Sequence, residues 1–155
     1  MRLMFLVLTI LISGFATVIQ AATAEAAPSS LPVLAKRSTS TSPSGHVRSM
    51  ECNIHPDGVV IDRNFDGIAT KEELSFSLTG DIGAKIADVA ATKPEVTMNG
   101  PMDFSYSLVA FRTSSSGIQD TVTLGSFNGT TGEQTFNPSS SAVILRDLLN
   151  SVCGN

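Results

Sequence analysis

The second half of the chain alternates between apolar and polar residues, and this period of two predicts β-strands. Residues 104–111 place Phe, Tyr and Leu on one side and serines on the other. Residues 120–127 repeat the alternation, with valine and leucine opposed to threonines. The Asn-Gly-Thr-Thr-Gly sequence at 128–132 is typical of a hairpin turn, so residues 133–136 are predicted to form a short returning strand. Together these segments predict an antiparallel sheet.

Two strands and a loop are predicted nearer the start of the chain. Residues 46–54 alternate loosely, and Gly58-Val-Val-Ile61 is a β-branched run that suits a buried strand. His55-Pro-Asp-Gly58 between them has the composition of a turn. Residues 95–103 contain an Asn-Gly-Pro sequence and are predicted to be a loop.

Helical periodicity is clearest at the C-terminal end. One of Ser139, Ser140 and Ser141 is expected to cap this helix, and Gly154 is expected to end it. The apolar face of the helix consists of Ile144, Leu145, Leu148, Leu149 and Val152.

Two shorter helices are predicted in the middle of the chain. Asp81 is a suitable cap for residues 82–91, in which apolar residues recur at helical spacing. Thr70 and Glu73 form a capping-box pattern, which predicts another helix that stops at Gly80.

The chain contains two cysteines, Cys52 and Cys153. In an oxidising compartment such a pair forms a disulfide, and closing a loop of roughly 100 residues stabilises a protein by up to about 4–5 kcal/mol. A reactive or intermolecular thiol is the alternative. Neither cysteine belongs to a CxxC motif or a metal-ligand cluster, so redox catalysis and a structural zinc are not supported.

These patterns predict one globular domain over residues 46–155, of the α+β class. We expect a small antiparallel sheet of three to five strands with two or three helices packed on one side. One disulfide would join the two ends of the domain.

The first residues have the features of a secretory signal. Arg2 precedes a nearly unbroken apolar run over residues 3–19, and small residues at 21–26 offer several cleavage sites. We therefore predict a signal peptide over residues 1–24, because the run is short for a membrane anchor. The protein is expected to be secreted and extracellular, without membrane association after the signal is removed.

Residues 25–45 are rich in Ser, Thr and Pro and show no apolar periodicity, which predicts a disordered propeptide and linker. Within them, Lys36-Arg37 resembles the dibasic sites that kexin-type proteases cut in fungal prepro-proteins. The resemblance implies a mature chain that begins at Ser38, and the alternative is a chance Lys-Arg pair. In these features the chain resembles small secreted prepro-proteins of fungi, of the effector-like or killer-toxin-like kind.

The charge of the chain disfavours nucleic acid as a partner. The full chain carries a net charge of −4. Removing residues 1–37 takes away three basic residues and one acidic residue, so the charge of the mature chain falls to −6. An acidic domain without a basic cluster gains nothing from the phosphate attraction that drives nucleic-acid binding.

Residues 62–73 have the spacing of an EF-hand calcium loop. The expected ligands are Asp62, Asn64, Asp66, the carbonyl of Ile68, Thr70 and Glu73. The segment resembles solitary extracellular calcium loops of the strand–loop–helix type, although Phe65 and Ala69 depart from the pattern and the entering helix is missing. The alternative is a metal-free turn that leads into a helix with an acidic first turn. No other cofactor is expected.

Enzymatic chemistry has little support in the sequence. The two histidines, His46 and His55, both lie near the start of the domain, and no Gly-x-Ser-x-Gly motif is present. Asn128-Gly-Thr130 is an acceptor sequence for N-glycosylation on a predicted hairpin tip, or simply a turn that happens to precede Thr.

A short secreted chain with joined ends and a β-rich second half also resembles the guanyl-specific ribonucleases of fungi and the ribonuclease-like effectors. The likeness is one of architecture only. Those enzymes need a histidine late in the chain, and none follows His55, so the resemblance implies at most an inactive relative.

These observations lead to a primary hypothesis and two alternatives. We expect a secreted, non-enzymatic, monomeric protein that acts by binding an extracellular or host protein, in an effector-like or toxin-like manner. The first alternative is an extracellular calcium-binding module that uses residues 62–73. The second is an inactive ribonuclease-like protein.

Overall fold

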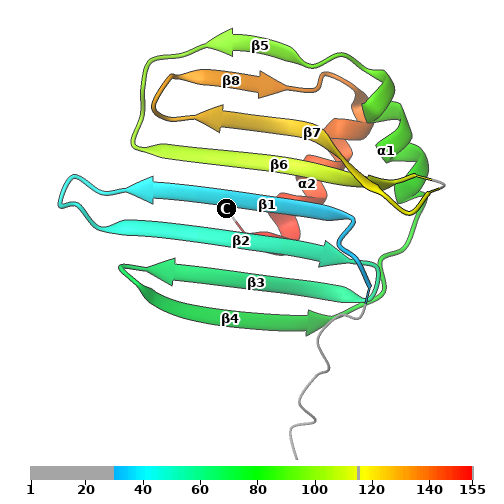
Figure 1. Ribbon diagram of the computed structural model, residues 1–155, viewed down its shortest axis with the longest axis horizontal. Coiled ribbons are helices and arrows are strands. Elements are labelled where there is room, and N and C mark those ends of the chain that lie inside the picture. Colours follow the sequence, from blue (N-terminus) through cyan, green and yellow to red (C-terminus); the bar gives the residue numbers. More distant parts are fainter. Residues whose placement is uncertain (1–29, 115, 155) are drawn as a thin grey trace, which may run out of the picture.

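The computed structural model describes residues 30–114 and 116–154, and its main feature is a single antiparallel sheet. The strands are β1 (Leu34–Thr41), β2 (Val47–His55), β3 (Gly58–Phe65), β4 (Ile68–Ser75), β5 (Glu95–Met98), β6 (Phe104–Thr113), β7 (Gln119–Asn128) and β8 (Glu133–Phe136). Their order across the sheet is β4-β3-β2-β1-β6-β7-β8-β5 (Figure 1). The first strand in sequence therefore lies in the middle of the sheet.

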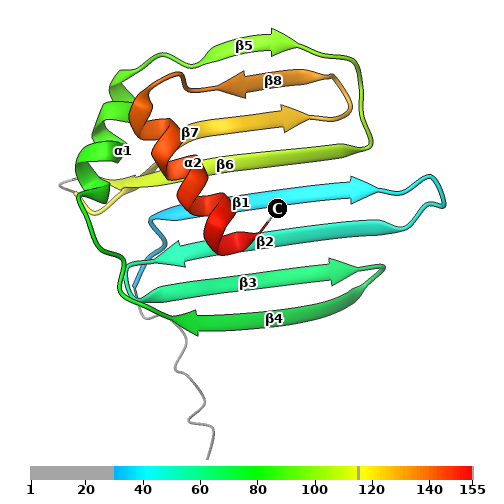
Figure 2. The same cartoon turned by 180° about the vertical axis from the view of Figure 1, so that it is seen from behind.

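Two helices, α1 (Ile82–Ala91) and α2 (Ser140–Cys153), pack on the same side of the sheet (Figure 2). We call this the helix side and the opposite face the far side. The Asp81 carboxylate accepts a 3.0 Å hydrogen bond from the Ala84 amide, and the Ser139 hydroxyl accepts a 3.1 Å bond from the Ala142 amide. Both predicted N-caps are thus confirmed.

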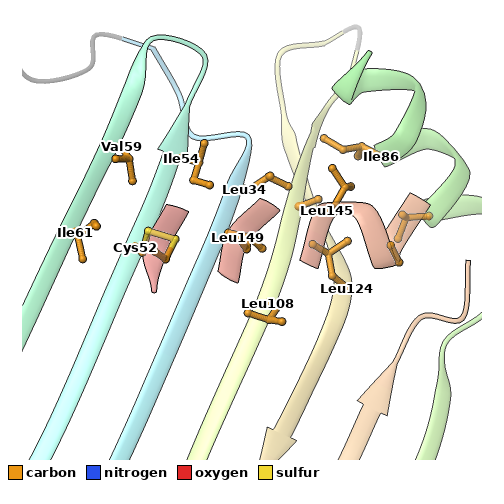
Figure 3. Close-up of a cluster of buried hydrophobic side chains, with 14 residues drawn as sticks. Leu34, Cys52, Ile54, Val59, Ile61, Ile86, Leu108, Leu124, Leu145 and Leu149 are labelled. Carbon is orange, nitrogen blue, oxygen red and sulfur yellow. A yellow bond between two sulfur atoms is a disulfide. The ribbon is translucent and has the colours of Figure 1, made fainter. Parts of the chain in front are cut away.

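The hydrophobic core lies between α2 and one end of the sheet (Figure 3). Leu34, Ile54 and Leu124 come from three different strands and are fully buried, as are Leu145 and Leu149 of α2. Complete burial of each such side chain contributes about 1.5–3 kcal/mol. The apolar stripe of α2 therefore determines which end of the sheet is covered.

The predicted disulfide between Cys52 and Cys153 is confirmed. It joins the centre of β2 to the last residue of α2, with a Cα–Cα distance of 5.9 Å and a sequence separation of 101 residues. Both cysteines are buried in the core, so the bond fixes the end of α2 against the sheet.

Asn137 connects the two helices through a buried side chain. Its amide donates 3.0 Å hydrogen bonds to the carbonyls of Val89 and Thr92 at the end of α1. Its side-chain oxygen accepts a 3.1 Å bond from the Ser139 amide, just before α2. All three bonds offset the cost of burying a polar amide.

The α+β class is confirmed, but the sheet is larger than the three to five strands predicted. Three segments account for the difference. β1 occupies part of the predicted linker at 25–45, β4 replaces the predicted helix at 70–80, and β5 lies in the predicted loop at 95–103. The helix at 82–91, the C-terminal helix and the strands at 46–54, 104–111, 120–127 and 133–136 are confirmed.

β1 shows why the prediction of disorder over residues 34–41 is wrong. Leu34 and Ala35 are fully buried, and the strand pairs with β2 along one edge and with β6 along the other. These partners are distant in sequence or separated by a turn, so no local periodicity reveals them. Strand pairing and burial at one end of β1 order a segment whose composition alone is that of a linker.

Lys36 and Arg37, the predicted processing site, lie in the middle of β1. Cleavage after Arg37 would remove Leu34 and Ala35 from the core and divide the central strand. Since kexin-type proteases need an extended, accessible substrate, the folded chain does not present this bond to them. Cleavage after Arg37 itself stays a prediction.

No helix within the described ranges is long and apolar enough to cross a membrane. The predicted signal peptide, residues 1–24, lies outside the described residues, so secretion stays a prediction.

Candidate ligand-binding groove

On the helix side, the helices cover the sheet toward one end of the strands and leave it open toward the other end (Figure 2). In the strand register, rows of side chains cross β6, β1, β2, β3 and β4 on this side. Rows near the helices hold buried residues such as Leu34 and Cys52. The two open rows are Phe104, Ser40, Arg48, Phe65 and Ile68, and next to them Tyr106, Ser38, Met50, Arg63 and Thr70.

Two adjoining hollows lie over these rows. One, of about 570 Å³, lies over β1–β4 and is lined by both Arg48 and Arg63. The other, of about 640 Å³, lies between β6 and the side chains of α2. They share Ser38, Ser40 and Arg48, and we call the two together the open groove. Each hollow falls within the range of about 300–1,000 Å³ that is typical of small-molecule sites.

Apolar side chains line both ends of the open groove and remain exposed. Phe65 is 42% exposed and Ile68 is 70% exposed at the β3–β4 end, while Phe104 is 43% exposed at the β6 end. The Phe104 ring packs on Phe127 with a centroid distance of 5.0 Å, and Tyr106 stacks on Phe127 at 6.3 Å. These side chains provide apolar contact area at both ends of the groove.

Two arginines lie diagonally across β2 and β3 within the groove. The Arg48 guanidinium lies 5.0 Å from the centre of the Phe65 ring, a cation–π geometry. Among the described residues, no carboxylate forms an ion pair with Arg48. Arg63 differs, because its Nη1 lies 2.8 Å from the Glu72 carboxylate. Arg48 is therefore the cation in the groove best placed to meet an anionic ligand.

The two sides of the sheet differ in charge. Across β1–β4, the helix side carries Lys36, Arg48 and Arg63 against one acid, Glu72. The far side of the same strands carries two cations and three acids, which are Arg37, Lys71, Glu51, Asp62 and Glu73. From α2, Arg146 and one acid, Asp147, also line the groove. The groove thus carries more cationic than anionic side chains, although the chain as a whole is acidic.

The charges on the far side are largely paired with each other. Arg37 lies 3.0 Å from the Glu51 carboxylate, and the Asn53 amide donates to the same carboxylate at 3.2 Å. Burial alone raises the pKa of Glu51, but these hydrogen bonds and the charge of Arg37 outweigh it and leave that pKa lowered. The hydrogen bond to Glu73 raises the pKa of Lys71.

At the closed end of the groove, two cations are committed to structural contacts. Lys36 Nζ donates a 3.0 Å hydrogen bond to the side-chain oxygen of Asn150 and a 2.6 Å hydrogen bond to the Gly154 carbonyl. Burial lowers the pKa of Lys36. Arg146 Nη1 donates to the carbonyls of Leu124 and Asn137 at 2.8 and 2.9 Å. Both side chains anchor α2 to the sheet.

The predicted calcium loop at 62–73 is instead a tight β-hairpin. Strands β3 and β4 pair along their full length, and a two-residue turn at Asp66 and Gly67 connects them. Both turn residues have positive φ, 50° and 88°, as in the type I′ turns that Asp-Gly favours. The strand–loop–helix interpretation of this segment is therefore wrong.

The hairpin separates the six proposed calcium ligands. Asp62 pairs with Lys71 across the far side, whereas Thr70 pairs with Arg63 on the helix side. Asn64 accepts a 2.8 Å bond from the Gly67 amide, and the Glu73 carboxylate contacts Lys71. Alternation along β4 places Thr70 on the opposite side of the sheet from Asp62, Asn64 and Glu73. Glu73 pairs with Val60 rather than with Asp62, and Ile68 begins the paired part of β4. In the described part of the chain, no three His, Cys, Asp or Glu side chains form a metal-binding group.

Asp66 has a different role, in which it joins the two hairpin tips. Its carboxylate lies 2.5 Å from His46 Nδ1 and accepts a 2.8 Å hydrogen bond from the Val47 amide. The His46 ring also stacks on Phe65 at 5.7 Å. This cluster positions Phe65 at the edge of the open groove.

The other two candidate residues lie apart from the groove. His55 Nδ1 is 2.7 Å from the Ser30 carbonyl, at the opposite end of β2. Asn128 is exposed at the end of β7, where its side-chain oxygen accepts from the Thr130 and Thr131 amides at 3.0 and 3.3 Å. The hairpin predicted at Asn128 is confirmed, while glycosylation stays a prediction.

No sequence motif marks the residues of the open groove. Ser38 and Ser40 lie in a segment with the composition of a linker, and no motif surrounds Arg48 or Arg63. A weak signal existed at Asp66-Gly67, a hairpin dipeptide between strand-forming residues, which predicts the partner strand β4. No local pattern in the sequence predicts that β6, β1, β2 and β3 follow one another in the sheet.

Comparisons of the chain with protein-family models, with curated proteins and with solved structures found no match.

Proposed function

We propose that the protein is a secreted, non-enzymatic binding protein, effector-like or toxin-like in its action, whose ligand occupies the open groove. One observation carries this proposal. One end of the helix side is uncovered, and there the sheet exposes Phe65, Ile68 and Phe104. Between them lies Arg48, which forms no ion pair within the described ranges.

The composition of the groove supports binding by contact and charge. Aromatic and aliphatic side chains provide apolar contact area, and the hydroxyls of Ser38, Ser40 and Thr70 provide directional hydrogen bonds. The arginines provide positive charge. A small number of polar groups in a mostly apolar site is the usual arrangement of a ligand pocket.

The disulfide supports an extracellular location. The Cys52–Cys153 bond is buried in the core, and disulfides persist in oxidising compartments. The apolar run at 3–19 points to the same compartment.

Co-purification of small molecules tests the proposal. Purified protein is mixed with an organic-solvent extract of cells, passed through a gel-filtration column, and analysed by mass spectrometry for molecules that stay bound. We expect at least one bound compound, recovered chemically unchanged, that is lost in Arg48→Glu and kept in Arg37→Glu.

Arg37→Glu is the matched control, because Arg37 is an exposed strand arginine on the far side. A compound retained equally by both variants, or no retained compound at all, would overturn the proposal. Chemical conversion of the compound during incubation would show an enzyme instead.

A further inference from the structure

We propose that Asn99 is a site of spontaneous deamidation, at which the side-chain amide is converted into aspartate and isoaspartate while the protein is folded. Two Asn-Gly pairs, Asn99-Gly100 and Asn128-Gly129, lie in neighbouring turns at one end of the sheet (Figure 1). The structure distinguishes the two pairs, because it leaves the reacting groups of the first accessible and binds those of the second.

The reaction takes place between two groups that adjoin in the chain. The backbone nitrogen of the residue after asparagine attacks the side-chain carbonyl carbon. Its proton leaves with the side-chain nitrogen as ammonia, which closes a succinimide ring. Water then opens the ring at either carbonyl and gives aspartate or isoaspartate. The reaction therefore needs an accessible backbone N–H, which glycine shields least because it has no side chain, and a carboxamide that can turn toward it.

Gly100 provides the accessible nitrogen. It is exposed, and none of the described residues accepts a hydrogen bond from its N–H. A methyl group added to its Cα would meet nothing within 4 Å. No neighbouring part of the described chain therefore shields this nitrogen from attack geometry or from water.

The Asn99 carboxamide provides the mobile partner. It is exposed, and in the described part of the chain it makes a single hydrogen bond, from Nδ2 to Gln134 Oε1 at 2.7 Å. Water competes well for such a bond between surface side chains, so the bond holds the amide weakly. The carboxamide can therefore turn toward the Gly100 nitrogen without disturbing the fold.

The second Asn-Gly pair is held in place. The side-chain oxygen of Asn128 accepts hydrogen bonds from the Thr130 and Thr131 amides at 3.0 and 3.3 Å. The Gly129 N–H donates a 2.9 Å bond to the Ser105 hydroxyl, and Gly129 is buried. A methyl group there would lie 2.2 Å from a backbone carbonyl oxygen. These bonds must break before the ring can close, which should make Asn128 react at least about tenfold more slowly than Asn99.

Deamidation at Asn99 would weaken the edge of the sheet. The Asn99 N–H continues the pairing of β5 through a 2.7 Å bond to the Gly132 carbonyl. The fit is close, since a methyl group on Gly132 would lie 1.7 Å from the Asn99 carbonyl oxygen. The new carboxylate cannot donate to Gln134, and isoaspartate adds a methylene group to the backbone at this tight contact. The edge strand β5 is therefore expected to separate from β8 more readily.

Peptide mapping by mass spectrometry tests the inference on folded, full-length protein made without N-glycosylation and stored at mildly alkaline pH. Trypsin separates the two sites, because Arg112 lies between them. We expect acid to accumulate at Asn99 at least about tenfold faster than at Asn128, as both aspartate and isoaspartate. The reduced, denatured chain is the control, in which the two Asn-Gly pairs should react at similar rates.

Two variants assign the difference to the structure. Gly100→Ala should slow the reaction at Asn99, because the methyl group shields the nitrogen but occupies open space and leaves the fold intact. Ser105→Ala removes the acceptor of the Gly129 N–H and should speed the reaction at Asn128 by roughly two- to tenfold, without changing the rate at Asn99. Hydrogen exchange of the β5 amides should be faster in stored wild type than in stored Gly100→Ala.

Three outcomes overturn the inference. One is conversion at Asn128 that equals or exceeds conversion at Asn99 in the folded protein. Another is no conversion at Asn99 over a period in which the denatured chain reacts. The third is formation of acid at Asn99 at the same rate in Gly100→Ala as in the wild type, which would mean direct hydrolysis without ring closure.

Discussion

Lys36 Nζ in β1 donates a 2.6 Å hydrogen bond to the backbone carbonyl of Gly154, the residue that ends α2. The same ammonium donates to Asn150 at 3.0 Å. A cation at the C-terminal end of a helix donates hydrogen bonds to carbonyls that lack a partner within the helix, and it interacts favourably with the negative end of the helix dipole. The central strand is thus bonded to the last helix, beside the disulfide that joins β2 to the same helix end.

This contact changes the expectation for the dibasic site. We predict that the folded protein resists a kexin-type protease at Arg37, because both neighbouring strands are hydrogen-bonded to β1. Intact-mass measurement after digestion checks this. The reduced, denatured chain serves as control and should be cut at Arg37. Release of a fragment that begins at Ser38 from the folded protein would contradict the prediction.

Replacing Lys36 with Met should destabilise the protein. Met keeps most of the apolar stem but loses both hydrogen bonds, leaving the Gly154 carbonyl and the Asn150 oxygen without this donor. Loss of hydrogen bonds from a charged donor predicts a decrease of about 1–3 kcal/mol in the free energy of unfolding, measured by guanidinium denaturation. Unchanged stability would mean that the burial of the charge cancels the two bonds.

Comparing wild type with Lys36→Met across alkaline pH should reveal the lowered pKa of Lys36. Between that lowered pKa and the ordinary value of 10.5, the unfolded chain binds more protons than the folded one. The cost of burying the charge therefore disappears as the pH rises through this window, and wild type gains stability relative to the variant. The free amine still donates to both acceptors. A difference between the two proteins that stays constant with pH would refute the assignment.

Replacement by alanine should have opposite effects on stability at two glycines, Gly67 in the hairpin turn and Gly83 in α1. Gly67→Ala forces an L-residue to φ +88° and should cost about 1–2 kcal/mol, although nothing lies within 4 Å of the added methyl. Gly83→Ala in α1 also meets open space, but at a helical position, and should stabilise the protein by about 0.5–1 kcal/mol. Thermal melts of both variants measure the contrast. Equal shifts would show that the hairpin turn lacks the positive φ described.

Calcium should leave the melting temperature unchanged, even at the millimolar concentrations that weak extracellular sites require. The hairpin pairs Asp62 with Lys71 and directs Thr70 to the opposite side of the sheet. Glu73→Ala should accordingly alter stability by less than about 1 kcal/mol, because it removes one partly exposed ion pair with Lys71. A calcium-dependent rise in melting temperature that disappears in Glu73→Ala would restore the metal site.

Local patterns in the sequence determined the elements that can be recognised one at a time. The apolar stripe and serine cap of α2, the Asp81 cap of α1 and the alternation in β6 and β7 are properties of neighbouring residues. The presence of two cysteines, Cys52 and Cys153, was enough to predict one disulfide between them. These features depend on periodicity, capping and chemistry, which act within a few residues or through a single bond.

Only the tertiary structure decided that residues 34–41 form the central strand and that residues 68–75 continue a hairpin. Strand hydrogen bonds are made with other segments, so β1 is ordered by β2 and β6 and by the burial of Leu34, while its serines and threonines resemble a linker. The open groove arises in the same way. The helices cover the strands toward one of their ends, and strand pairing brings Ser40, Arg48 and Phe65 into one row toward the other end, which the helices leave uncovered.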